Sequence, residues 1–357
     1  MQRSRFIAGT ASLGGFALSG LPVSAENTPT NVRVIFFGVA SNLPVWCGIS
    51  KGFFAREKLD VTTTVTPGSV YMMQHLAAGD FDIAHTAIDN CVAYDEGQGE
   101  VALPQPAEFV TVMGGDSGLL SVWARPEING WSDLRGKTLA VDAVTTGFSF
   151  VLQRMLKLGG VQGSEYQLAP AGGTPKRYKA LAESDKFAAA VLTPPFDLLA
   201  QAHGLKKLGS ANDALGHYQA YAGVARKDWV GQNRDTVVRY IRGYVAALHW
   251  LYDSENKDEA AALLVSNAHV PENLAPRVLT EITGPGGMDR NAAIDSEGLR
   301  TVLSLRTEYG KPHKLLTDAD KYVDKSAYAE ATFAPSLKPT VNGEIDSNVL
   351  VRSQRPR

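Results

Sequence analysis

The stretch VRVIFFGVASNLPVWCGISKGFFAREKLDV, residues 32–61, decides the fold. Its apolar run at 32–37 is typical of a parallel strand that is covered on both faces. Pro44 suits the first turn of a helix, where its missing N–H costs no hydrogen bond, and Gly52 ends that helix. A second strand is predicted at 59–65. The stretch therefore predicts a strand, a helical crossover and a parallel strand.

The same alternation continues downstream and then starts again. Further strands are predicted at 81–86, 119–125, 137–142 and 218–226. Helices with apolar residues at helical spacing are predicted at 147–158, 234–252, 256–267, 271–282 and 291–308. We therefore predict an α/β protein with two lobes, each a mostly parallel sheet flanked by helices, and a helical C-terminal part.

The order of these segments predicts that the chain leaves the first lobe and later returns to it. We assign residues 30–118 and 222–335 to lobe 1 and residues 119–221 to lobe 2. The polar, proline-containing segment 336–357 is expected to be a loose tail.

Residues 1–25 have the pattern of a signal peptide. Arg3 and Arg5 precede a weakly apolar segment, and Ala25 closes a small-x-small cleavage site. The apolar segment is glycine-rich and short for a membrane span. We expect the mature protein to be exported to the periplasm, by a route that the two arginines leave open.

Export allows two states for the cysteines. In an oxidising compartment Cys47 and Cys91 can form a disulfide, since each is predicted in a helix that follows a strand of the same lobe. Two buried free thiols are the alternative, and the sequence leaves both open.

Composition and motifs disfavour several classes of function. The chain has 357 residues and a formal net charge of -2, whereas nucleic-acid binding needs clustered Lys and Arg. The seven histidines show no metal-ligand spacing, so no metal or other cofactor is expected. The segment GGDSGLL, 114–120, contains the Gly-Asp-Ser-Gly of trypsin-like proteases, but those enzymes need an all-β double barrel and a positioned His and Asp.

Small polar side chains follow the predicted strands, at the sheet edge where open parallel sheets bind ligands and helix N-termini attract anions. Ser41 and Asn42 follow the first strand, and Trp46 could form an apolar wall one turn on. The simpler interpretation is that Ser41 and Asn42 only cap the helix. The pattern recurs after other strands, at Ser69, Thr86, Asn90, Thr145, Thr146, Phe148 and Thr193. This recurrence favours a ligand cleft between two lobes.

Four motifs carry a family resemblance. They are LPVWCGISKGFFAREKLDV (43–61), AAGDFDIAHT (77–86), WSDLRGKTLAV (131–141) and AAAVLTPPFDLLAQAHGLKKLG (188–209). In this order the sequence resembles the solute-binding proteins of ABC importers, in the nitrate/sulfonate/taurine-type group that also includes pyrimidine-precursor binders. The resemblance covers about residues 32–255 and is weaker in the helical C-terminal part.

The resemblance implies a two-lobed periplasmic-binding-protein fold of type II. It also implies a monomer that closes over a small anionic or aromatic ligand and hands it to a membrane permease. Carried over by position, the ligand contacts are Ser41, Asn42, Ser69, Thr86, Thr145, Thr146 and Thr193. For Trp46, Phe148 and Tyr218 two interpretations stay open, stacking on an aromatic ligand and packing in the core, and the core is favoured. Those edges hold no Arg or Lys, so an anion would rely on hydroxyls and helix N-termini. The alternative is an enzyme on the same fold, a decarboxylase or a pyrimidine-precursor-synthase-like protein.

Overall fold

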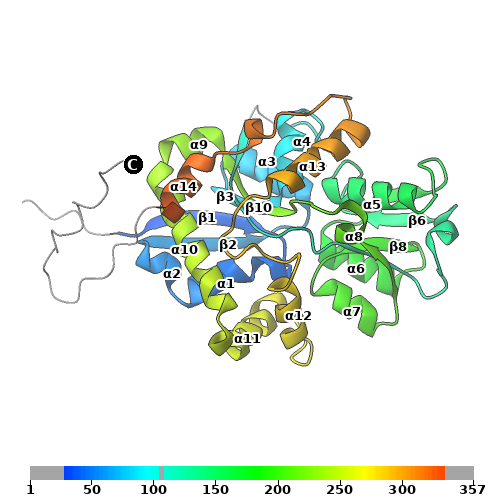
Figure 1. The fold of residues 1–357 in the computed structure, drawn as a ribbon, viewed down its shortest axis with the longest axis horizontal. Coiled ribbons are helices and arrows are strands. Elements are labelled where there is room, and N and C mark those ends of the chain that lie inside the picture. Colours follow the sequence, from blue (N-terminus) through cyan, green and yellow to red (C-terminus); the bar gives the residue numbers. More distant parts are fainter. Residues whose placement is uncertain (1–27, 104–107, 334–357) are drawn as a thin grey trace, which may run out of the picture.

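Two five-stranded sheets organise the computed structural model, which describes residues 28–103 and 108–333 (Figure 1). The first sheet has the strand order β2-β1-β3-β10-β4 and the second has the order β7-β6-β8-β5-β9. The strands of the first sheet are β1 (Thr30–Phe36), β2 (Leu59–Val65), β3 (Ile83–Ala87), β4 (Phe109–Gly114) and β10 (Tyr221–Arg226). Those of the second are β5 (Ser121–Ala124), β6 (Thr138–Val141), β7 (Gln167–Pro170), β8 (Ala189–Leu192) and β9 (Lys206–Ser210).

One strand in each sheet runs against its neighbours. The pairs β1–β2 and β1–β3 are parallel, as are β6–β7 and β6–β8. In contrast, β10 is antiparallel to β3 and β4, and β5 is antiparallel to β8 and β9. Both strands follow a crossover from the other lobe. The predicted two-lobed α/β fold with mostly parallel sheets is thus confirmed, and each sheet is mixed through its one antiparallel strand.

Helices cover both sheets (Figure 1). In the first lobe they are α1 (Leu43–Ser50), α2 (Phe53–Arg56), α3 (Ser69–Ala78), α4 (Ile88–Asp95), α9 (Lys227–Gln232) and α10 (Arg234–Tyr252). The C-terminal helices are α11 (Lys257–Ala268), α12 (Ala275–Ile282), α13 (Ser296–Tyr309) and α14 (Lys325–Phe333). The second lobe contains α5 (Gly147–Leu158), α6 (Thr174–Glu183), α7 (Phe196–Ala202) and α8 (Ala211–Leu215).

The predicted helices 147–158 and 234–252 have the predicted bounds. The helix predicted at 291–308 begins later, at Ser296, because Ala292 has a left-handed backbone and Asp295 caps the helix by accepting a hydrogen bond from the Glu297 N–H. The segments 1–25 and 336–357, predicted as signal peptide and tail, lie outside the described residues. The residue bounds assigned to the two lobes stay a prediction.

The first sheet separates two buried clusters of side chains. Val34 and Phe36 point to the face covered by α1, α10, α11 and α12. Ile35 and Phe37 point to the opposite face, which α3, α4 and α13 cover. This alternation follows from the period of two in a strand. The cluster that contains Ile35 and Phe37 continues into the second lobe, where it includes residues of α5. Helix α13 therefore packs on both lobes.

Of the two alternatives for the cysteines, the structure has the free thiols and not the Cys47–Cys91 disulfide, because the sheet lies between the two residues. Cys47 of α1 is buried on one face and Cys91 of α4 on the other, and both are free thiols. Successive crossovers of this sheet pass on opposite faces, since β2 and β3 lie on opposite sides of β1. Burial raises the pKa of the Cys47 thiol to about 12 and raises that of Cys91 further.

The glycine-rich segment at 114–118 forms the first crossover between the sheets. Its backbone is held by the loop after α12. The Asp289 N–H donates to the Gly115 carbonyl at 2.8 Å, and the Ser117 N–H donates to the Gly287 carbonyl at 3.1 Å. A Cβ on Gly114 would lie 2.0 Å from a backbone carbonyl oxygen, so this close approach needs glycine. The protease-like GGDSG thus has a structural role.

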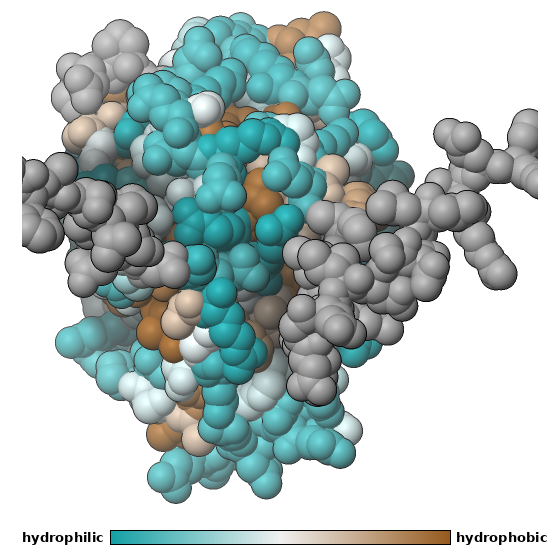
Figure 2. Space-filling model, turned by 90° about the vertical axis from the view of Figure 1, so that its left-hand side faces the viewer, coloured by the Kyte–Doolittle hydropathy of each residue, from teal (hydrophilic) through white to brown (hydrophobic). Residues whose placement is uncertain are grey.

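Figure 2 shows the end of the first lobe that lies on the left of Figure 1. Its visible surface is mostly hydrophilic, with small and separate hydrophobic patches. Within residues 28–103 and 108–333, no helix has both the length and the hydropathy needed to cross a membrane.

Candidate functional site

A cavity lies between the two lobes, at the carboxyl ends of strands from both sheets. Phe37 follows β1 and Asn90 lies in α4 after β3, both in the first lobe. Asp142 follows β6, and Thr146 lies just before α5, both in the second lobe. The lobes are so close that only about 20 Å³ is open to the centres of water-sized molecules. That space holds about one water, so the structure shows the lobes together.

Arg177 of α6 lines this cavity and is only 2% exposed. Its Nε donates to the Val191 carbonyl at 3.0 Å, its Nη1 to the Gly172 carbonyl at 2.9 Å, and its Nη2 to the Thr174 hydroxyl at 2.9 Å. All three acceptors are neutral, and no described carboxylate forms an ion pair with Arg177. Burial lowers the pKa of Arg177, although the charge of Asp142 acts in the opposite direction. The guanidinium is therefore a buried cation that forms no ion pair, although the charge of Asp142, which lines the same cavity, acts on it.

Three aromatic rings form the apolar wall of the cavity. The Tyr221 ring meets the Phe37 ring edge-on at 6.3 Å between centroids, and meets the Phe148 ring edge-on at 6.2 Å. Edge-to-face contacts at such distances are favourable for aromatic rings. Phe37 and Tyr221 belong to the first lobe and Phe148 to the second, so this wall is assembled only when the lobes approach.

Asp142 joins the lobes beside the cavity. Its Oδ2 accepts a hydrogen bond from the Ser69 N–H at the start of α3, at 3.0 Å. A carboxylate at a helix N-terminus is stabilised by the helix dipole. A Cβ on Gly68 would lie 3.0 Å from the Asp142 Oδ1, so the glycine allows the two lobes to come this close.

Three of the predicted contact residues, Asn90, Thr146 and Phe148, line the cavity. A fourth, Thr86, lies behind Asn90, whose Nδ2 donates to the Thr86 hydroxyl at 2.8 Å. Ser69 lies beside the cavity and contributes its backbone N–H, which donates to Asp142 as described above. Sequence reasoning therefore predicted the edges that meet but not all of the side chains that face the cavity.

The other predicted contacts lie elsewhere. Asn42 holds the backbone after β1, because its Nδ2 donates to the Phe37 carbonyl at 2.7 Å, and Ser41 beside it is buried near Asp116. Trp46 packs edge-on against Phe36 in the core. The remaining two are Thr193, buried with no hydrogen-bond partner for its hydroxyl among the described residues, and Thr145, which is bound to Glu100. Tyr218 is also fully buried.

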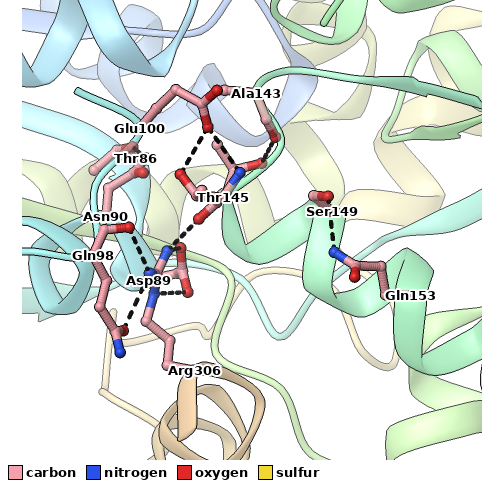
Figure 3. A network of polar contacts seen from close by, with 11 residues as sticks. Thr86, Asp89, Asn90, Gln98, Glu100, Ala143, Thr145, Ser149, Gln153 and Arg306 are labelled. Atoms are coloured by element: carbon pink, nitrogen blue, oxygen red, sulfur yellow. Dashed lines mark hydrogen bonds and ion pairs between the residues drawn. The ribbon is translucent and has the colours of Figure 1, made fainter. Parts of the chain in front are cut away.

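A polar network joins the lobes next to the cavity (Figure 3). Arg306 of α13 forms two hydrogen bonds of 2.6 Å to the carboxylate of Asp89 in α4, and both side chains are buried. The Nη2 of Arg306 also donates to the Thr145 carbonyl of the second lobe at 2.7 Å. From the first lobe, the Glu100 carboxylate accepts hydrogen bonds from the Thr145 N–H at 2.9 Å and from its hydroxyl at 2.8 Å.

The sequence analysis missed three functional candidates, Asp142, Arg177 and Arg306. Asp142 lies directly after a predicted strand, where the position alone could have identified it. Both arginines lie on the buried face of a helix. In α6 the buried residues are Thr174, Arg177 and Leu181, at helical spacing. An arginine within an apolar stripe is thus the signal that could have been used.

Comparisons with known proteins identify a family and several similar structures. A search of curated proteins finds no match. Among solved structures, a protein from Bordetella bronchiseptica RB50 aligns with a TM-score of 0.73 and 18% identity, over 86% of this chain and 98% of that one. The nitrate-binding NrtA of Synechocystis PCC 6803 aligns with a TM-score of 0.72 and 14% identity, over 87% and 90%. The alkanesulfonate-binding SsuA of Xanthomonas axonopodis pv. citri aligns with a TM-score of 0.67 and 13% identity, over 84% and 99%.

At these identities the alignments show a shared fold, which is that of periplasmic binding proteins. The family comparison goes further. The model described as the NMT1-like family matches residues 25–265, which is more than half of the chain. The protein therefore belongs to the NMT1-like family.

Proposed function

We propose that the protein captures a small organic anion between its lobes and delivers it to the membrane permease of an ABC importer. The observation that carries the proposal is the buried, unpaired guanidinium of Arg177 in the cavity between the lobes. The family and the nitrate- and sulfonate-binding proteins of the same fold support it.

A buried charge without a counterion is costly, because desolvation is not offset by a partner. An anionic ligand would supply that partner. Arg177 has five N–H donors, and three of its nitrogens make one described bond each, which leaves one N–H on each terminal nitrogen. Charge-assisted hydrogen bonds to a carboxylate or sulfonate are stronger than neutral ones. We therefore expect the negative end of the ligand to lie on Arg177.

The remaining contacts follow from the cavity lining. We propose that Asn90 and Thr146 hydrogen-bond the ligand from opposite lobes and that Phe148 and Tyr221 pack on its apolar part. The cavity lies between lobes that are in contact, so an organic anion cannot enter it while they are together. Binding would therefore require the lobes to part and close again, a motion of the hinge type.

The proposed site of action is the periplasm. Relatives of the same fold are periplasmic binding proteins, and the sequence of residues 1–25 suits a cleaved signal peptide. We expect the mature protein to begin near Glu26 and to be released by osmotic shock. N-terminal sequencing of the released protein would test this, and an intact Met1 on cytosolic protein would contradict it.

Isothermal titration calorimetry against nitrate, aliphatic sulfonates and aromatic carboxylates tests the ligand class. We expect one of these anions to bind with a stoichiometry of one per chain. Arg177→Met should weaken its binding free energy by about 1.5–3 kcal/mol, roughly 10- to 100-fold in affinity. Lys176→Met is the matched control, because Lys176 is exposed on the neighbouring position of the same helix. Equal affinity in Arg177→Met and wild type, with circular dichroism showing both folded, would refute the role of Arg177.

The alternative function, an enzyme on the same fold, is separated by recovering the bound molecule. A transport protein returns its ligand unchanged after incubation with excess protein. Neither cysteine lines the cavity, and burial keeps both thiols protonated, which disfavours a cysteine nucleophile. Detection of a chemically altered ligand by mass spectrometry would refute the transport proposal and support the enzyme.

A further inference from the structure

Helix α5 begins at the cavity without an acidic residue of its own at its N-terminus. The sequence of its first turn, GFSF, contains no Asp or Glu, and the hydroxyl of Thr146, just before the helix, donates to the Ala143 carbonyl at 2.9 Å. The free N–H groups at a helix N-terminus carry a partial positive charge that favours a nearby carboxylate. Thr146 and Phe148 at this end of α5 line the cavity, so the position of this end decides the shape of the site.

A carboxylate from the other lobe lies at this end of α5 (Figure 3). Glu100, in the loop after α4, accepts two hydrogen bonds from Thr145, one from its N–H at 2.9 Å and one from its hydroxyl at 2.8 Å. Both bonds cross from the second lobe to the first. Glu100 is partly buried, so water and salt screen its charge less than they screen that of an exposed carboxylate.

The loop that carries Glu100 is fixed to the first lobe. The Gln98 N–H donates to the Ala93 carbonyl of α4 at 2.7 Å. A Cβ on Gly99 would lie 2.7 Å from the Tyr94 ring, so the loop packs on α4 more closely than an alanine there would allow. The carboxylate of Glu100 is therefore held in place before the lobes meet, and such preorganisation reduces the entropy lost on contact.

Arg306 of α13 and a close packing contact complete the arrangement. The Arg306 Nη2 donates to the Thr145 carbonyl at 2.7 Å and its Nη1 to the Gln98 carbonyl at 3.3 Å. Thr145 is thus held through its N–H, its hydroxyl and its carbonyl by side chains outside the second lobe. Next along the chain, a Cβ on Gly147 would lie 2.4 Å from the Asp89 Cγ, so the start of α5 rests directly on α4.

We propose that Glu100 is a positioning residue of the ligand site, which holds the start of α5 against the first lobe and thereby sets the fraction of molecules whose lobes are together. The inference rests on the proposed function, because Thr146 and Phe148 are proposed ligand contacts. Closure itself can be measured without a ligand, so the two proposals can fail separately. The bonds to Glu100 are charge-assisted and are exchanged for bonds to water when the lobes part. Their loss should therefore lower the ratio of closed to open molecules by about tenfold.

Amide hydrogen exchange, followed by NMR on the full chain without added ligand, tests this through bonds that do not involve Glu100. Three other N–H groups donate from one lobe to the other: Ala40 to the Pro194 carbonyl at 3.0 Å, Ser69 to the Asp142 Oδ2 at 3.0 Å, and Gly173 to the Pro67 carbonyl at 3.3 Å. Each can exchange when the lobes part, so its protection measures the ratio of closed to open molecules. We expect Glu100→Ala to lower the protection of all three N–H groups by the same factor, about tenfold.

Two controls separate closure from general stability. The Ile35 N–H in the middle of β1 is the internal reference, because β1 is paired on both sides within the first sheet. Its protection should be the same in Glu100→Ala and in the wild type. Glu108→Ala is the control variant, since the Glu108 side chain is 78% exposed and lies 3.3 Å from Lys227 of the same lobe. This variant should leave the three N–H groups between the lobes unchanged.

Thr145→Val removes the hydroxyl bond from the opposite lobe and tests the same contact. Its effect should be smaller than that of Glu100→Ala, and the double variant should lose no more than Glu100→Ala alone, because Glu100 accepts both bonds. A double variant that loses the sum of the two single effects would refute the proposal.

Two results with Glu100→Ala would also overturn it. Unchanged protection of the three N–H groups would confine the role of Glu100 to Thr145, and an equal fall at Ile35 would make it a matter of overall stability. In the wild type, exchange of the three N–H groups at the rate of an unfolded chain would show that the lobes are mostly apart, and would refute the proposal as well. Because no ligand is used, a failure to find the transported anion leaves these results intact.

Discussion

Replacement of Arg306 by methionine should destabilise the protein strongly and also weaken ligand binding. Arg306 and Asp89 are 0% and 1% exposed, and two hydrogen bonds of 2.6 Å join them. The same guanidinium donates to the Thr145 carbonyl of the other lobe and lies over the Phe150 ring at 4.9 Å. The variant therefore removes one ion pair, one contact between lobes and one cation–π contact.

The expected magnitude is about 3–5 kcal/mol in the free energy of unfolding, because the substitution leaves a buried carboxylate without its partner. Most of this loss is the cost of leaving the Asp89 carboxylate buried and unpaired, and not the net stabilisation that the ion pair provides. Neutralising that group should therefore recover stability. We expect the double variant Arg306→Met with Asp89→Asn to be more stable than Arg306→Met alone, because a pair without net charge avoids the buried anion.

Urea denaturation followed by circular dichroism measures both values. Arg135→Met is the control, since Arg135 and its partner Glu165 are 47% and 34% exposed, and an exposed pair contributes about 1 kcal/mol or less. The interpretation is refuted if Arg306→Met costs no more than the control. It is also refuted if the double variant loses the sum of the two single losses, because the residues would then be independent.

Three further predictions follow from the described contacts. Burial opposes the charge of Glu96, but hydrogen bonds from two lysines and a tyrosine outweigh it and lower the pKa of Glu96 to about 2. This side chain therefore stabilises the fold above its ordinary pKa of 4.5, and thermal scans should show the difference between wild type and Glu96→Gln shrinking as the pH falls towards about 2. Cys47 and Cys91 should be inert to a thiol reagent in the native protein and give two thiols per chain after denaturation; fewer than two would restore the disulfide. Gly114→Ala should cost at least about 1–3 kcal/mol, whereas Gly130→Ala, which meets open space, should stay within about 0.5 kcal/mol in the same urea assay.

Strands and helices with a complete local pattern were predictable from the sequence. The helix 147–158 has its apolar residues on one stripe, and the structure gives it the same bounds. The apolar run at 32–37 became β1, at 30–36, because it is covered on both faces. In contrast, β9 at 206–210 carries two exposed lysines and no hydrophobic alternation, so only its pairing with β5 identifies it as a strand.

The meeting of strand ends between the lobes was predictable from sheet topology, but the cavity lining was not. Polar residues after strands meet between the lobes, as expected for parallel strand ends. Which of them face the cavity depends on helix orientation and on the distance between lobes. Asn42 turned towards its own backbone, whereas Asn90, in an equivalent place after β3, lines the cavity. Local sequence does not distinguish these two asparagines.

The missed arginines have a common physical explanation. Arg177 lies three residues after Thr174 and four before Leu181, and Arg306 lies three after Leu303 and four after Val302, all on buried helix faces. In a helix, residues at these spacings share a face, so a lone arginine there is carried into the core. Burial of such a charge requires a partner. Arg306 has one within the chain, in Asp89, and this pair fastens α13 to the first lobe. Arg177 donates only to neutral acceptors, so within the described residues its charge is balanced only through space, by Asp142 of the same cavity.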